Sequence, residues 1–193
     1  MNKTLFNPFE TNSAAKLLLL GLLFTAIGCA LAAHFNARFD GVLDLHFVET
    51  LWWKPVLDNI VNISSSVLVL FFAGFYFNKK TRLKDILAIS VFCRYPLYLL
   101  PLFNIDSIMI KAGENLMSDF NVGTVPDFDV RTVIVLLVFG IFAILMIVWF
   151  LINLYNGFQI ATNAKGNRAV FVFVAAIILM EIISKIGIAL LFP

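Results

Sequence analysis

Five long apolar stretches constrain this chain more than any other feature of its sequence. They cover approximately residues 14–33, 56–77, 86–103, 133–155 and 169–192, and each is long enough to cross a hydrocarbon core of ~30 Å as an α-helix. Hydrophobic residues make up 61% of the chain, well above the ~45–50% of a soluble globular domain. The sequence therefore predicts one all-α domain over residues 1–193, a polytopic transmembrane bundle of five helices.

The third stretch contains two residues that disturb a regular membrane helix. Pro96 has no backbone N–H, so it predicts a break about one turn earlier, near Phe92. Arg94 lies near the middle of the same stretch. A charge at that depth is costly, so we expect Arg94 to contact a polar partner elsewhere in the bundle.

Basic residues predict which side of the membrane each connection faces, because cytoplasmic segments are enriched in Lys and Arg. With a cytoplasmic N-terminus, eight basic residues lie inside: Lys3, Lys16, Lys79, Lys80, Arg82, Lys84, Lys165 and Arg168. Four lie outside: Arg38, Lys54, Lys111 and Arg131. The distribution predicts a cytoplasmic N-terminus and a C-terminus on the outer side.

Four charged residues fall inside the predicted spans: Asp58, Arg94, Glu181 and Lys185. A rise of ~1.5 Å per residue places Arg94 and Glu181 near the midplane, and Asp58 and Lys185 near the outer face. We therefore expect the pairs Arg94–Glu181 and Asp58–Lys185, together with an i,i+4 contact between Glu181 and Lys185.

This polar network has two interpretations. It either fixes which helices pack together or lines a path for an ion, a proton or a lipid headgroup. The basic run Lys79, Lys80, Arg82 and Lys84 sets the topology, and its four residues are also candidates for contact with anionic lipids.

The connections carry weaker signals. Ser13 is a candidate N-cap for the first helix, although this first stretch also resembles a signal peptide ending in small residues. Alternating apolar residues over Leu43–Phe47 indicate a strand-like or interfacial segment, and residues 107–120 a short interfacial helix. The polar turn over residues 156–168 predicts that the last two spans are antiparallel neighbours.

Sequence motifs for catalysis or cofactor binding are missing. There is no phosphate-binding loop, no dinucleotide fingerprint and no nucleophile with a base at motif spacing. An outer metal site is conceivable from the residues His34, His46, Asp40, Asp44 and Glu49. Their spacing matches no metal motif, so we expect a solvated loop. We expect no enzymatic activity, no cofactor and no nucleic-acid partner. The binding partners that we expect are membrane lipids, other proteins or a second copy of the chain.

Three landmarks carry a family resemblance: the Asn-Pro-Phe start at Asn7–Phe9, the mid-span proline stretch Arg94–Phe103, and the hairpin Trp149–Leu179 with its Tyr-x-Gly turn and basic residue. Together they resemble the Yip1 family of five-span integral membrane proteins, in its bacterial branch. The resemblance implies a non-enzymatic protein of the bacterial cytoplasmic membrane that acts as a scaffold or membrane-organising factor. The alternative is a small transporter or channel component that uses Arg94 and Glu181.

Overall fold

The computed structural model of the protein describes residues 8–122 and 129–192. This part of the chain is mostly helical, and five of its helical segments are long and apolar enough to cross a membrane. The prediction of an all-α helical bundle is therefore confirmed, and five of its helices have the length and composition of membrane spans. Lys3 and Asn7, used above for orientation and for the family resemblance, lie outside the described residues.

The first two predicted spans match α2 (Ala14–His34) and α3 (Lys54–Phe77). Before α2, the chain forms a short 3-10 helix, η1 (Pro8–Glu10). Ser13 caps α2 as predicted, because its hydroxyl accepts a hydrogen bond from the backbone N–H of Lys16 at 3.4 Å.

The third span is broken where Pro96 predicts. The helix α4 (Leu83–Phe92) ends at Phe92, and after a turn the chain continues as the 3-10 helix η2 (Leu97–Phe103). This span is the centre of the bundle, since α4 contacts α2, α3 and α6. Over an 18-residue apolar stretch of this span 72% of the residues are buried, against 6% over the corresponding stretch of α6. The irregular backbone of the third span is therefore kept away from lipid.

The fourth span is longer than predicted. After η3 (Ile105–Ser107) and α5 (Ile108–Val122), α6 runs from Val130 to Thr162, so the end predicted at Tyr155 is wrong. Gly157 is a packing residue within this helix and not part of a turn. A Cβ there would lie 2.9 Å from both the Ile89 Cγ2 and the Phe9 Cε2 atoms.

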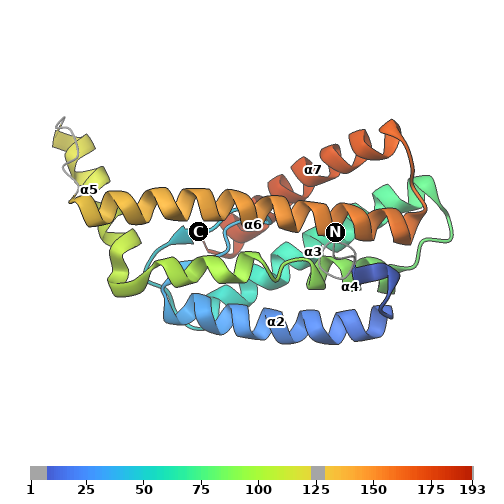
Figure 1. Ribbon diagram of the computed structural model, residues 1–193, viewed down its shortest axis with the longest axis horizontal. Coiled ribbons are helices and arrows are strands. Elements are labelled where there is room, and N and C mark those ends of the chain that lie inside the picture. Colours follow the sequence, from blue (N-terminus) through green and yellow to red (C-terminus); the bar gives the residue numbers. More distant parts are fainter. Residues whose placement is uncertain (1–7, 123–128, 193) are drawn as a thin grey trace.

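The true turn between α6 and α7 (Asn167–Leu191) contains Asn163 and Gly166, whose φ angles are 55° and 78°. The two helices run antiparallel as predicted (Figure 1), but the prediction that they are neighbours is wrong over most of their length. They meet near the turn, where the Phe158 and Phe173 rings lie 5.8 Å apart, and α7 then packs along α3. Gly187 permits this approach, because a Cβ there would be 2.9 Å from Val61 Cγ1.

The long helices alternate in direction along the bundle (Figure 1). The start of α2, the α3–α4 turn and the α6–α7 turn lie at one end, on the right of the view. We call it the basic end, because the α3–α4 turn carries the basic run. The connection between α2 and α3 and the helix α5 lie towards the opposite end.

Candidate functional site

The connection between α2 and α3 folds into the bundle instead of remaining outside it. β1 (Ala37–Arg38) pairs with β2 (His46–Phe47) in an antiparallel register. Between them, Phe39 and Val42 are only 1% and 0% exposed. We call residues 37–47 the buried hairpin. Its backbone is irregular, so its N–H and C=O groups need polar partners from the surrounding helices.

Asp58, fully buried in α3, forms an ion pair with Arg38 of the buried hairpin. Arg38 Nη2 lies 2.6 Å from Asp58 Oδ1, and Arg38 Nε donates to Oδ2 at 3.0 Å. The Phe192 ring covers the guanidinium group, with 4.1 Å between its centroid and Arg38 Cζ. The predicted pair of Asp58 with Lys185 is therefore wrong, because the hairpin brings a closer cation.

Arg94, in the turn after α4, is 1% exposed. Its Nη1 donates to the carbonyl of Val42 at 3.2 Å, and its Nε to Asn59 Oδ1 at 3.3 Å. No ion pair links Arg94 to an acidic side chain within the described residues, so the predicted pair with Glu181 is wrong. Val42 lies between Arg94 and α7: its carbonyl accepts from Arg94, and its N–H donates to Ser184 of α7. The hairpin backbone therefore takes the place that the prediction gave to Glu181.

α7 supplies three polar contacts to the hairpin. Besides Ser184, Glu181 Oε2 accepts a hydrogen bond from the N–H of Leu43 at 2.9 Å. Lys185 Nζ lies 2.5 Å from Asp44 Oδ2 and 3.8 Å from Glu181 Oε1. The predicted i,i+4 contact between Glu181 and Lys185 is confirmed.

All four predicted charges thus contact the same short segment, residues 38–44, although not in the predicted pairs. Sequence reasoning missed Arg38, which it placed in an outer loop, and also Asn59 and Ser184. A signal for Asn59 existed, because it lies on the polar face of α3 that includes Asn62. Asn62 donates to the carbonyl of Phe39 at 2.8 Å, so this face binds the hairpin at several points.

A second chain of hydrogen bonds links Arg94 to the surface of α2. Tyr98 donates its hydroxyl proton to Asn59 Oδ1 at 3.1 Å, and the same hydroxyl lies 3.1 Å from Thr25 Oγ1. Gly28 leaves room for the Tyr98 ring, because a Cβ at that position would be 2.3 Å from two ring atoms. The polar network therefore reaches four of the five candidate spans.

Among the residues of α3 and of the third span, three buried polar atoms have no hydrogen-bond partner within the described residues: Arg94 Nη2, Asn62 Oδ1 and Ser90 Oγ. One is a donor, one an acceptor and one can be either. Buried groups of this kind are uncommon and call for an explanation in each case.

The residues considered for a metal site lie mostly apart. His46 Nδ1 is 3.6 Å from Asp40 Oδ2, and both side chains are about two-fifths exposed, at 42% and 41%. Within the described part of the chain, no three side chains of His, Cys, Asp or Glu gather closely enough to hold a metal ion.

The basic run divides into two pairs at the basic end. Lys79 and Lys80 lie in the turn after α3 and are exposed. Arg82 and Lys84 instead line a groove of about 420 Å³. Its other lining residues are Ser13, Ala14, Ala15, Leu18 and Asp85.

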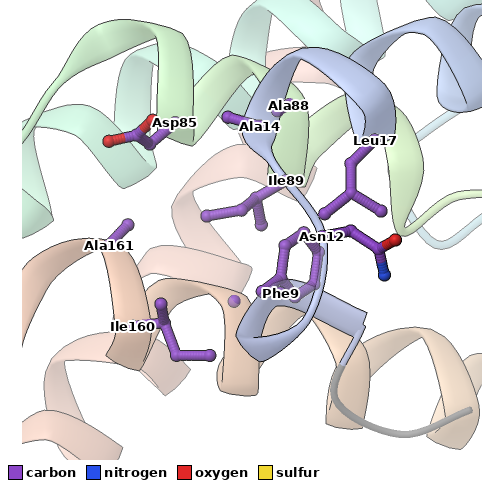
Figure 2. A pocket seen from close by; sticks show the side chains of 10 residues that line it. Phe9, Asn12, Ala14, Leu17, Asp85, Ala88, Ile89, Ile160 and Ala161 are labelled. Atoms are coloured by element: carbon purple, nitrogen blue, oxygen red, sulfur yellow. The ribbon is translucent and has the colours of Figure 1, made fainter. Parts of the chain in front are cut away.

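A second cavity, of about 240 Å³, lies beside this groove and shares Ala14 and Asp85 with it. In Figure 2 the Ile89 side chain lies near the middle of the view, with Asp85 to its upper left and with Phe9 and Asn12 to its lower right. Its lining is mainly apolar and comes from η1, α2, α4 and α6. The basic end therefore offers an apolar cavity and a basic groove next to each other.

No family model matches the sequence, and no curated protein or solved structure shows significant similarity to it.

Proposed function

We propose that the protein is a non-enzymatic, membrane-organising protein that holds partners at the two faces of the membrane, in keeping with its resemblance to the Yip1 family. The proposed location is the bacterial cytoplasmic membrane, with the basic end and the N-terminus in the cytoplasm. The positive-inside distribution supports this orientation.

One observation carries the proposal. All four charged residues of the predicted spans contact the buried hairpin: Asp58 through Arg38, and Arg94, Glu181 and Lys185 directly. Arg94 and Glu181 bind backbone groups of the hairpin, and Asp58 and Lys185 pair with its side chains, so all four are occupied by structural contacts. Such a network supports a fixed scaffold better than a path along which a solute moves.

The test is a flux measurement on the purified protein reconstituted into liposomes. The scaffold proposal expects ion and proton fluxes equal to those of protein-free liposomes, for the wild type and for Arg94→Gln alike. A flux that the wild type supports and that Arg94→Gln abolishes while still folding would overturn the proposal.

A second candidate function, a small transporter or channel component, is favoured by a different observation. Arg94 is a buried cation without an acidic partner among the described residues, and its Nη2 atom has no hydrogen-bond partner there. An uncompensated buried charge is a recognised mark of ion or proton pathways. The same flux measurement separates the two functions, because only this candidate expects a signal that depends on Arg94.

A further inference from the structure

The groove at the basic end carries unpaired positive charge. Arg82 and Lys84 are exposed, and neither forms an ion pair within residues 8–122 and 129–192. Asp85 is the acidic residue in the lining, so two cations face one carboxylate. The groove therefore attracts an anionic group, and it does so at the end of the apolar helices, where headgroups lie.

The same face of α2 continues as an apolar surface towards the other end of the bundle. Leu18 lines the basic groove, and Leu22, one turn further, begins a second groove of about 530 Å³. This groove has a mostly apolar lining: Leu22, Thr25, Ala26, Cys29, Ala30, Ala33, Trp52 and Val56. Because these α2 residues recur every three or four positions, the two grooves lie on one helix face.

The distance from the start of the basic groove at Ser13 to the start of the second groove at Leu22 matches one leaflet of a bilayer. From Ser13 to Leu22 the helix rises about 14 Å at ~1.5 Å per residue, close to half of a ~30 Å hydrocarbon core. A molecule with an anionic head and an apolar chain of that length extends from the basic groove to the start of the second groove at Leu22. A free anion satisfies only the first.

We propose that this face of α2 binds an anionic phospholipid of the adjacent leaflet. The phosphate lies between Arg82 and Lys84, and one acyl chain follows Leu18 and ends near Leu22, where the second groove begins. The site stands independently of the scaffold function, since a lipid occupies it whether or not the protein holds partners.

The experiment measures thermal unfolding of the delipidated full-length protein in a neutral detergent. Additions are phosphatidylglycerol, phosphatidylcholine or inorganic phosphate, and native mass spectrometry counts the bound lipids. The key variant is Arg82→Gln/Lys84→Gln. Its matched control is Lys79→Gln/Lys80→Gln, which removes the same charge from the same basic run without altering the groove.

We expect phosphatidylglycerol to raise the unfolding temperature of the wild type and of the control by several degrees, and that of the groove variant by much less. Phosphatidylcholine and inorganic phosphate should have little effect. Asp85→Asn should tighten phosphatidylglycerol binding, because it removes the opposing carboxylate.

Three outcomes would overturn the proposal. The control variant loses as much stabilisation as the groove variant, which indicates attraction by net charge alone. Phosphatidylcholine stabilises as well as phosphatidylglycerol, which shows that the headgroup charge is not recognised. Inorganic phosphate reproduces the full effect, which identifies a free-anion site. A flux measurement has no bearing on any of them, so the lipid site and the scaffold function fail separately.

Discussion

Arg38 and Asp58 form a two-point ion pair across the boundary between the buried hairpin and α3, with contacts of 2.6 Å and 3.0 Å. The Asp58 side chain is fully buried and that of Arg38 is 10% exposed. This pair fixes the start of the hairpin to the helix that follows it in the chain.

Removing one partner of this pair should be strongly destabilising. We expect Asp58→Asn to lower the free energy of unfolding by about 3–5 kcal/mol, because Arg38 keeps a buried charge without compensation. Denaturant titration in detergent micelles measures the loss. The control is Arg131→Gln, which removes an exposed pair with Asp106 and should cost less than ~1 kcal/mol. Equal losses in the two variants would contradict the structural role of the pair.

Charge reversal tests whether Arg94 and Glu181 act on each other. Since Arg94 contacts Val42 and Asn59 while Glu181 contacts Leu43, we expect Arg94→Glu and Glu181→Arg each to reduce the folded yield. The double variant should not recover, because neither reversed charge meets its original backbone partner. Restoration of the wild-type yield in the double variant would show that the two side chains pair directly.

Two glycines within helices should respond in opposite ways to alanine. A Cβ at Gly21 of α2 would lie 2.8 Å from the Phe92 backbone, whereas one at Gly140 of α6 meets nothing within 4 Å. We expect Gly21→Ala to destabilise by about 1–3 kcal/mol through overpacking, and Gly140→Ala to stabilise by up to ~1 kcal/mol through helix propensity. Thermal unfolding of both variants in one detergent checks the signs. A neutral Gly21→Ala would mean that α2 and α4 are further apart.

Cysteine labelling tests the proposed orientation. Both native cysteines are buried, so the wild type should react weakly with a membrane-impermeant maleimide. In intact cells, Glu49→Cys should react, and Lys80→Cys should react only after the membrane is permeabilised. The reverse pattern would place the basic end outside.

Local chemistry allowed part of this structure to be predicted from the sequence. The Ser13 cap and the helix end caused by Pro96 depend on neighbouring residues, and both are found. The contacts of Arg94 and Asp58 depend on where residues 38–44 lie, and an amphipathic connection with three acids gives no sign that it enters the bundle. The predicted end of the fourth span is too early for a related reason. A glycine such as Gly157 that follows aromatic residues suggests a turn, and only its packing against Ile89 shows that the helix continues.

The hairpin also sets an order of events during synthesis. Val42 bonds to Ser184, which is added 142 residues later. At ~5–20 residues per second, the hairpin waits on the order of ten seconds or more for this partner. Until α7 arrives, the N–H groups of Val42 and Leu43 lack the acceptors, Ser184 and Glu181, that make their burial tolerable, so water is their better environment. The packing of the hairpin against α7 is therefore among the last steps of biogenesis. A chain truncated before α7 should insert its earlier helices but leave the N–H groups of Val42 and Leu43 without their partners.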